Sequence, residues 1–297
     1  MVYRGLVVPL PTLFDAKGGL DPVASAEFAA DIRKNGADRL FVLGSLGEFP
    51  SVSFDEREAL VSAIVASRPE AKDVWVGVGA PSTRDAIRYA KSAESAGASA
   101  IVAVPPYYLH PSPAAIERYY RAIHAAVKLP MYSYNIPSLV GYSLDSAMVH
   151  RLAKDGVLVG TKDTSNSLAS VGQFLAGAPS GFEVYPGDDH LAAEGIRLGA
   201  AGAVMGLANV LPKLARDLVM AAHSSNATET ARLQALIEAL EFIVAGGPFP
   251  AAGKFLAAHL RRAKAGYRAP YDPLTPEEER RVLDRWSALK DRLGEFV

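Results

Sequence analysis

The feature that most constrains the fold is the regular alternation of short apolar runs with longer segments of helical period. Most of these runs contain adjacent apolar residues, which is typical of strands covered on both faces in a parallel sheet. The predicted strands are Leu6–Leu10, Arg39–Leu43, Val74–Val78, Ala100–Val104, Met131–Tyr134, Val157–Thr161, Phe182–Tyr185 and Ala203–Gly206. The predicted helices between them include Pro22–Lys34, Phe54–Ala66, Thr83–Ala96 and Ala114–Ala126. Because parallel neighbours need crossover connections, the alternation predicts an α/β fold.

A weak internal repeat supports this interpretation. The segments NGADRLFVL, AGASAIVAV and LGAAGAVMG each place Gly-Ala at the end of a helical stretch, shortly before a strand. Glycine suits the left-handed residue that closes a helix, so the same corner recurs three times. Eight strand–helix units predict a (β/α)8 TIM barrel, to which we assign residues 1–224. The rival is a doubly wound sheet, which usually has a glycine-rich phosphate loop where this chain has PLPTLFDAKGG.

The remaining residues, 225–297, change character. The stretches ETARLQALIEALEFIVAG, AAGKFLAAHLRRAKAG and TPEEERRVLDRWSALKDRL predict three helices and no strand. The last stretch begins with Thr275, then Pro276 and glutamates, as helix N-termini commonly do. We therefore expect a C-terminal three-helix extension on the barrel.

Composition excludes several functional classes. The chain has no cysteine, which rules out disulfides, thiolate metal sites and cysteine nucleophiles. A net charge of −1 without blocks of like charge gives no reason to expect nucleic acid or an anionic membrane as a partner. We see no signal-peptide pattern, and no apolar run approaches the roughly 18 residues of a membrane span. A cytoplasmic location is expected.

Chemistry in such barrels sits at the carboxyl ends of the strands, where their side chains converge. The segments that end or follow the predicted strands are Gly44–Phe49, Pro105–Tyr108, Tyr132–Pro137, Lys162, Gly187–Asp189 and Gly206–Asn209. A lysine, several tyrosines, a serine beside glycines and a glutamate therefore meet at one face of the barrel.

Lys162 is the most unusual of these residues, because it stands at the end of the apolar run VLVGTK. Lysine is almost never fully buried without a partner, and burial favours the neutral, nucleophilic amine. The alternative is that Lys162 pairs with Asp163 or marks the point where a strand meets solvent. The convergence of reactive side chains at this face favours the nucleophile.

Three motifs resemble those of the dihydrodipicolinate synthase and N-acetylneuraminate lyase family of Schiff-base aldolases. They are GSLGE, where the family has G-[ST]-x-G-E, YNIPS for Y-N-x-P, and GTKDTS around the lysine. The resemblance covers the whole chain, including the helical tail. It implies a class I lyase in which Lys162 forms an imine with pyruvate or a related 2-oxo acid. The protonated imine is an electron sink that lets a C–C bond form or break.

The resemblance also implies roles for three hydroxyl groups. Tyr134 matches the proton shuttle of the family, Ser45 its relay hydroxyl, and Tyr108 a tyrosine that reaches in from a neighbouring subunit. A phenol is a poor base alone, so a relay of partners is needed. For Tyr107 and Tyr132 we expect ordinary packing with a wet hydroxyl tip instead.

The glycines of GSLGE suggest how a substrate carboxylate is bound. Gly44 and Gly47 let the backbone turn so that the amides of Ser45 and Leu46 point at the anion, because a nest of backbone donors needs no formal charge. Glu48 is then expected to hold the loop rather than to do chemistry.

Two residues depart from the family pattern. Leu46 stands where many relatives carry threonine, so the backbone must supply more of the carboxylate site. Leu139 stands where dihydrodipicolinate synthases carry an arginine that grips the carboxylate of their second substrate, and an apolar side chain cannot replace a guanidinium. Dihydrodipicolinate synthase is therefore disfavoured.

The acidic segment after the seventh predicted strand is expected to line the substrate pocket, with Asp188 or Asp189 bound to substrate hydroxyls. Gly206 is expected to bind substrate as well. A metal cluster of Asp188, Asp189 and His190 is less favoured, because adjacent residues point in different directions. The histidines show no ligand spacing on one helix. We expect no metal and no cofactor.

The sequence thus predicts a Schiff-base aldolase acting on pyruvate, a 2-keto-3-deoxy sugar acid or a similar 4-hydroxy-2-oxo acid. Open alternatives are a dehydratase of such a sugar acid through the same imine, or an N-acetylneuraminate lyase. A non-catalytic 2-oxo acid sensor is least favoured. The expected partners are a small-molecule substrate and further copies of the chain, as a dimer or a homotetramer.

Overall fold

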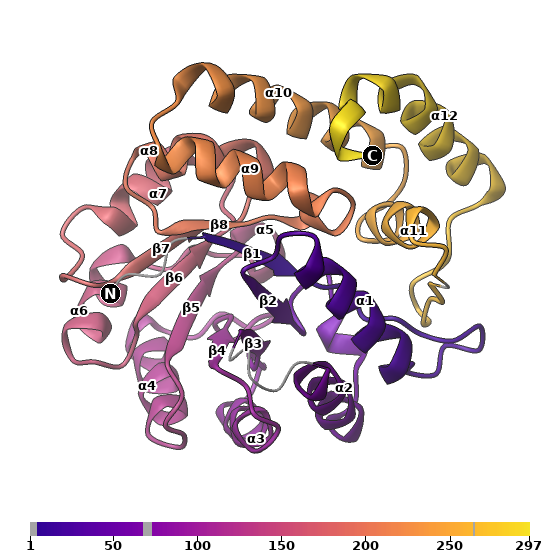
Figure 1. Ribbon diagram of the computed structural model, residues 1–297. Helices are drawn as coiled ribbons and strands as arrows, with labels where there is room; N and C mark the ends of the chain where they lie inside the picture. The colour runs from indigo at the N-terminus through magenta and orange to yellow at the C-terminus, as the bar shows by residue number, and fades with distance from the viewer. Residues whose placement is uncertain (1–4, 68–72, 264) are drawn as a thin grey trace.

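A computed structural model describes residues 5–67, 73–263 and 265–297, and it confirms the (β/α)8 barrel (Figure 1). The strands are β1 (Gly5–Pro9), β2 (Arg39–Val42), β3 (Val74–Gly77), β4 (Ala100–Ala103), β5 (Met131–Asn135), β6 (Gly160–Asp163), β7 (Glu183–Pro186) and β8 (Gly202–Val204). They pair in parallel in the order β7-β6-β5-β4-β3-β2-β1-β8. The amide of Ala201 donates to the carbonyl of Val184 over 2.9 Å where β8 approaches β7, which nearly closes the ring.

Helices between the strands cover the outside of the barrel. They are α1 (Pro22–Lys34), α2 (Phe54–Ala66), α3 (Thr83–Ser95), α4 (Pro113–His124), α5 (Pro137–Val140), α6 (Ser146–Lys154), α7 (Leu168–Leu175), α8 (Ala192–Arg197) and α9 (Pro212–His223). Short 3-10 turns are η1 (Phe49–Ser51), η2 (Asp189–Leu191), η3 (Gly206–Asn209) and η4 (Gly294–Phe296).

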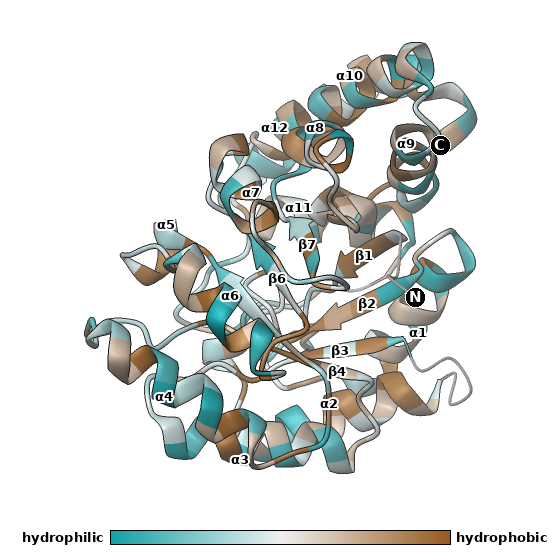
Figure 2. Ribbon diagram, turned by 90° about the vertical axis from the view of Figure 1, so that its left-hand side faces the viewer, coloured by the Kyte–Doolittle hydropathy of each residue, from teal (hydrophilic) through white to brown (hydrophobic). Residues whose placement is uncertain are grey.

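The strands carry few exposed residues because their side chains enter two separate cores. Val7, Phe41 and Trp75 point to the barrel interior, whereas Leu6 and Leu40 belong to the core between the strands and the outer helices. Successive residues of a strand face opposite sides, so both sets must be apolar. Figure 2 shows β1, β2 and β3 in the hydrophobic colour, while β6 and β7 carry hydrophilic residues. The polar residues of the barrel are thus concentrated in its second half.

The predicted helix-to-strand corners are present at all three repeats. Gly36, Gly97 and Gly199 have φ angles of 129°, 87° and 113°, in the region that side chains rarely adopt. Local hydrogen bonds also set the helix starts. Ser53 and Glu56 form a capping box at α2, as Thr275 and Glu278 do at the last helix.

The C-terminal residues form the three predicted helices, α10 (Ala227–Val244), α11 (Ala251–Leu260) and α12 (Pro276–Leu293). Figure 1 shows α10 lying along α9, with α12 beside it at the C-terminal end of the chain. Apolar residues of α10, among them Leu233 and Leu240, join the core that the outer helices of the barrel share. The tail is therefore packed on the barrel rather than linked loosely to it.

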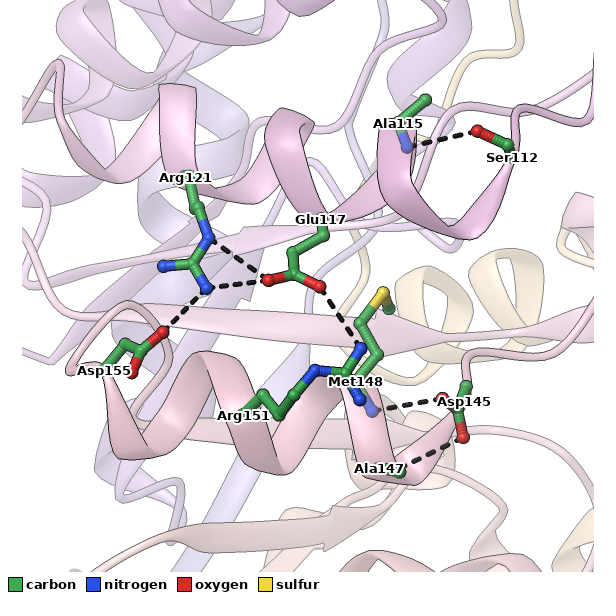
Figure 3. A network of polar contacts seen from close by, with 9 residues as sticks. All are labelled: Ser112, Ala115, Glu117, Arg121, Asp145, Ala147, Met148, Arg151 and Asp155. Carbon is green, nitrogen blue, oxygen red and sulfur yellow. Dashed lines mark hydrogen bonds and ion pairs between the residues drawn. The ribbon is translucent and has the colours of Figure 1, made fainter.

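Ion pairs tie neighbouring outer helices together beside β5. Glu117 of α4 accepts hydrogen bonds from Arg121 of the same helix and from Arg151 of α6, and Arg121 also binds Asp155 after α6 (Figure 3). All four side chains are partly exposed, so each pair contributes little to stability alone. Together they fix the relative position of the helices that follow β4 and β5.

Several predicted boundaries are wrong by one to three residues, and one of them affects the site. The sixth strand was expected at Val157–Thr161, but β6 spans Gly160–Asp163. Val157 and Leu158 are buried in the corner after α6, where both amides donate to the carbonyl of Leu152. Val157 and Leu158 are therefore buried in the turn between α6 and β6 and not in the strand. Lys162 lies within β6 instead of after it.

The other differences fall at element ends. The predicted seventh strand, Phe182–Tyr185, starts one residue before β7. The predicted eighth strand, Ala203–Gly206, starts one residue after β8, and its last residue, Gly206, belongs to η3. Thr83–Ala96 and Ala114–Ala126 also end one and two residues beyond α3 and α4. Among the described residues, no helix combines the length and apolar character needed to cross a bilayer.

Candidate functional site

Lys162 lies inside the barrel with its amine against Tyr134. The register pairs Tyr134 of β5 with Lys162 of β6, so the two side chains project side by side. The Lys162 Nζ donates to the Tyr134 Oη over 2.8 Å and lies 4.0 Å from the centre of the same ring. Only 6% of Lys162 is exposed. An amine held against a phenol in a sheltered wall has the geometry for proton exchange between the two groups.

The neighbouring acid does not neutralise this lysine. Asp163 accepts hydrogen bonds from Asn135 Nδ2 over 2.7 Å and from the Ser165 hydroxyl over 3.1 Å. Adjacent strand residues face opposite sides of the sheet, so Asp163 points toward the outer layer while Lys162 points inward. The alternative that Lys162 pairs with Asp163 is therefore wrong.

A second hydroxyl extends the contact. The Ser45 Oγ lies 3.5 Å from the Tyr134 Oη, so Lys162, Tyr134 and Ser45 form a continuous line of polar groups. The contact is long for a hydrogen bond between hydroxyls, and such contacts in active sites often shorten when substrate binds. The Ser45 hydroxyl therefore lies beside the Tyr134 phenol, and its part in a proton relay stays a prediction.

The loop that carries Ser45 is a tight turn. Gly47 N–H donates to the Gly44 carbonyl and Glu48 N–H to the Ser45 carbonyl, and the Thr12 hydroxyl holds the Gly47 carbonyl over 2.6 Å. A Cβ on Gly44 would lie 2.8 Å from the Phe41 ring, so glycine is required there. In the described part of the chain, the Ser45 and Leu46 amides have no acceptor, and both residues line the cavity beside Lys162.

Glu48 is turned into the protein and paired with a buried lysine that the sequence analysis did not identify. Its Oε1 accepts from Lys254 Nζ over 3.0 Å, and both side chains are almost fully buried. Burial lowers the pKa of Lys254, and the charge of Glu48 opposes this shift. Lys254 comes from α11, so a residue of the tail anchors the end of the turn. The position fits the expected structural role of Glu48.

The two aspartates after β7 have different partners. Asp188 Oδ2 accepts from the Asn166 amide over 2.8 Å, whereas both oxygens of Asp189 accept from the amides of Gly206 and Leu207, each over 3.1 Å. Burial raises the pKa of both carboxyls, that of Asp189 to about 7. Asp189 thus fixes the turn after β8, and Gly206 takes part through its backbone.

His190 points elsewhere. Its Nε2 lies 2.8 Å from Asn166 Oδ1 and its Nδ1 lies 3.7 Å from Glu241 Oε1. Across the residues that the structure describes, no group of three or more His, Asp or Glu side chains is arranged to hold a metal ion. The expectation of a metal-free and cofactor-free site stays a prediction.

These side chains surround a cavity of about 420 Å³ at the carboxyl end of the barrel. It is lined by polar groups of the barrel and by a stretch of the tail. Its lining includes Ser45, Leu46, Tyr134, Lys162, Thr164, Gly187, Asp188, Asp189, His190, Gly206, Glu241, Phe249 and Gly253. A second cavity of about 300 Å³ shares Ser45, Ile136, Phe249 and Pro250 with it and is also lined by Leu139 and Tyr107. The volumes suit a small-molecule substrate.

The structure separates the four tyrosines. Tyr132 stacks on Trp75 with ring centres 4.2 Å apart and donates to Glu183, and half-buried Tyr107 packs edge-on against Phe49. Tyr108 is 90% exposed with a φ of 74°, so it does not reach the cavity of its own chain. Such a backbone conformation is uncommon for a bulky residue.

Thr164 and Glu241 are polar cavity residues outside the site predicted from the sequence. Thr164 lies two residues after Lys162, which places it on the same side of the chain, and its buried Oγ1 has no hydrogen-bond partner among the described residues. The spacing in KDT was a usable signal for Thr164. Glu241 belongs to α10, and nothing in a helical tail marks which residue faces a distant strand end.

Comparisons with known proteins agree with this geometry. The model of the Dihydrodipicolinate synthetase family matches residues 2–289. A DapA-like lyase of Halobacterium salinarum is 34% identical over 282 residues, covering 95% of this chain and 92% of that protein. A 4-hydroxy-tetrahydrodipicolinate synthase of Neisseria meningitidis is 32% identical, covering 84% of this chain and 86% of that protein.

Among solved structures, YagE of E. coli K12, a prophage protein of the dihydrodipicolinic acid synthase family in complex with pyruvate, superposes with a TM-score of 0.91. It is 28% identical, and the match covers 98% of this chain and 99% of that one. The motifs, the barrel with its helical tail and the family match all point the same way. This chain belongs to the dihydrodipicolinate synthetase family.

Proposed function

We propose that the protein is a lyase that joins Lys162 to a 2-oxo acid as a Schiff base. The reaction is the cleavage of a 4-hydroxy-2-oxo acid, such as a 2-keto-3-deoxy sugar acid, to pyruvate and an aldehyde. The observation that carries the proposal is the buried contact of 2.8 Å between Lys162 Nζ and Tyr134 Oη in the wall of the cavity. The pyruvate in the YagE complex supports a 2-oxo acid as ligand.

In the proposed reaction, the amine of Lys162 adds to the keto carbon, and loss of water leaves a protonated imine. Tyr134 takes the proton of the hydroxyl on carbon 4, and the bond between carbons 3 and 4 breaks. Its electron pair moves toward the imine nitrogen, which gives an enamine and releases the aldehyde. Tyr134 returns the proton to carbon 3, and water hydrolyses the imine to free pyruvate and the amine.

The other residues of the turn after β2 have supporting roles in this proposal. The backbone amides of Ser45 and Leu46 bind the carboxylate of the 2-oxo acid, with Gly44 and Gly47 giving the backbone its shape. The Ser45 hydroxyl, 3.5 Å from Tyr134, passes protons to and from it. Carboxylate binding and proton transfer thus depend on the same turn.

A second copy of the chain is part of the proposal. Tyr108 is exposed and strained in its own chain, and a tyrosine contributed by a neighbouring copy completes the relay of hydroxyls. The assembly is at least a dimer, and a homotetramer is the form we propose for the cytoplasmic enzyme. Tyr108, Leu109, Leu139 and Phe249 are exposed large apolar or aromatic residues of this part of the molecule, which favours a covered surface.

The Leu139 position bears on which family reaction takes place. Leu139 is 59% exposed and lines the second cavity, and no described lining residue of either cavity is an arginine. A second substrate that must be gripped by its carboxylate has no guanidinium to bind. This observation supports cleavage over synthesis of the dihydrodipicolinate type. Elimination of water from a sugar acid through the same imine is the alternative reaction, and N-acetylneuraminate is an alternative substrate.

A panel of 2-keto-3-deoxy acids, incubated with the wild type and with Lys162→Ala, tests the proposal. Accumulation of pyruvate and an aldehyde identifies the aldolase, and accumulation of a dehydrated 2-oxo acid identifies the dehydratase. We expect pyruvate from the wild type and no turnover by Lys162→Ala. Turnover that survives in the variant would remove the imine from the reaction.

A further inference from the structure

The charges around the cavity are unevenly distributed. Three carboxylates line it, those of Asp188, Asp189 and Glu241. The side chains of the described lining residues that can carry a positive charge are Lys162 and His190. In the proposed function Lys162 bonds to the keto carbon, so its charge lies at the reacting end of the substrate and not at the distal end. Apart from Lys162 and His190, the ionisable side chains of the described lining are acidic.

Of these three carboxylates, Glu241 has the weakest contacts with the rest of the protein. Asp188 accepts an amide hydrogen bond from Asn166, and Asp189 has both oxygens bound to backbone amides. Glu241 Oε1 lies 3.7 Å from His190 Nδ1, and 46% of the Glu241 side chain is exposed. Its charge helps to raise the pKa of Asp189, so the two carboxylates act on the same region of the cavity.

The same wall offers partners for neutral hydroxyl groups. The buried Thr164 Oγ1 finds no hydrogen-bond partner in the described part of the chain, and a hydroxyl can both donate and accept. Carboxylate oxygens such as those of Asp188 and Glu241 accept from hydroxyl groups but repel another carboxylate. Backbone amides, the other common anion ligands, are bound to Asp188 and Asp189 on this side of the cavity.

We propose that Glu241 makes the cavity selective for 2-oxo acids whose distal end is hydroxylated and uncharged, and that it rejects acids ending in a second carboxylate or a phosphate. This inference rests on the proposed function for the orientation of the substrate. It adds the class of the aldehyde half, a neutral polyhydroxy aldehyde, and a residue of the tail that selects it.

Two acids of equal length test the selectivity. One is 2-keto-3-deoxygluconate, which ends in a hydroxymethyl group, and the other is the corresponding aldaric acid, which ends in a carboxylate. Calorimetric titration of Lys162→Ala with each acid measures binding without turnover. We expect at least about tenfold tighter binding of the hydroxymethyl acid, and a ratio of about threefold or less when Glu241→Gln is added.

Glu238→Gln is the matched control, since it removes the same charge from the same helix. Glu238 is exposed and does not line the cavity. The control should leave the affinity ratio unchanged, because a charge in open solvent is screened from the cavity. An equal effect of both substitutions would show a general electrostatic effect and overturn the role of Glu241.

The other outcomes are equally decisive. Equal affinity for the two acids, tighter binding of the aldaric acid, or no binding of either would contradict the selectivity. Failure of the proposed function is visible separately, as the absence of a pyruvate adduct on wild-type Lys162 after borohydride reduction. An adduct together with a preference for the aldaric acid would leave the lyase intact and refute this inference alone.

Discussion

At the scale of single residues, the site depends on a lysine and a tyrosine that share one hydrogen bond. Both are nearly buried, and their neighbours Ser45 and Phe41 supply a hydroxyl and an aromatic face within reach. Tyr132 and Tyr134 illustrate how much position matters. They stand two residues apart on β5, yet Tyr132 donates to Glu183 within the barrel core and Tyr134 meets Lys162.

This difference gives a matched pair of substitutions. Tyr134→Phe removes the proposed proton shuttle, and we expect turnover to fall by about two to three orders of magnitude while a pyruvate adduct still forms slowly. Tyr132→Phe removes a buried hydrogen bond instead and should cost about 1 kcal/mol of stability with little change in turnover. Steady-state kinetics and urea unfolding of both variants test this. Equal turnover of Tyr134→Phe and wild type would contradict the shuttle.

The carboxyl of Asp189 gives a prediction about pH. Burial, with Glu241 acting in the same direction, raises its pKa to about 7, so the folded state holds this proton more tightly than the unfolded chain does. Protonation of Asp189 therefore stabilises the fold fully below about pH 4, and the contribution is lost as the pH rises through about 7. Asp189→Asn should remove this part of the dependence. If the curves of unfolding free energy against pH for the wild type and Asp189→Asn were parallel, Asp189 would not titrate in this way.

At the scale of strands and helices, much of the site was predictable because the fold brings strand ends together. Recognising β2, β5 and β6 was enough to place Ser45, Tyr134 and Lys162 near one another. The start of β6 was not predictable, since Val157 and Leu158 are as apolar as strand residues but pack in a corner. Thr164 follows the end of β6, and its spacing of two residues from Lys162 was the available signal for its place in the cavity.

Close packing of β6 against the end of β7 leads to a second substitution. A Cβ on Gly187 would lie 2.6 Å from Lys162 Cε and would also meet the Thr164 hydroxyl. Gly187→Ala should displace the lysine and slow pyruvate adduct formation at least about tenfold, because small misplacements of reacting groups are costly. Gly172→Ala in α7 is the control and should behave as wild type, because an added Cβ there would meet no described atom within 4 Å beyond its own chain neighbours and helix backbone. Wild-type kinetics in Gly187→Ala would show that the lysine has room to move.

At the scale of the whole molecule, the tail is part of the site. The α10 helix supplies Glu241 to the cavity, and α11 supplies Lys254 to the turn that carries Ser45. Arg268, between α11 and α12, binds Glu56 of α2 and holds the pKa of that carboxyl at about 2. The three helices could be predicted from the sequence, but these contacts could not. They join residues about two hundred positions apart and leave no local pattern.

Loss of the buried ion pair is expected to affect both stability and binding. Lys254→Met leaves the Glu48 carboxylate buried without its cation, which should cost about 3–5 kcal/mol and raise the KM for the 2-oxo acid through the loosened turn. Adding Glu48→Gln should recover part of the stability. Lys213→Met breaks an exposed pair with Asp217 and should cost less than about 1 kcal/mol. Equal urea midpoints for the two lysine variants would contradict the anchoring role.

The most direct test of the central claim is covalent trapping. The wild-type protein is mixed with pyruvate, reduced with borohydride and examined by intact mass and peptide mapping, with Lys162→Ala treated in parallel. The imine mechanism predicts one reduced pyruvate adduct per chain, located on Lys162 and absent from the variant. An unmodified wild type, or an adduct that persists in Lys162→Ala, would contradict it.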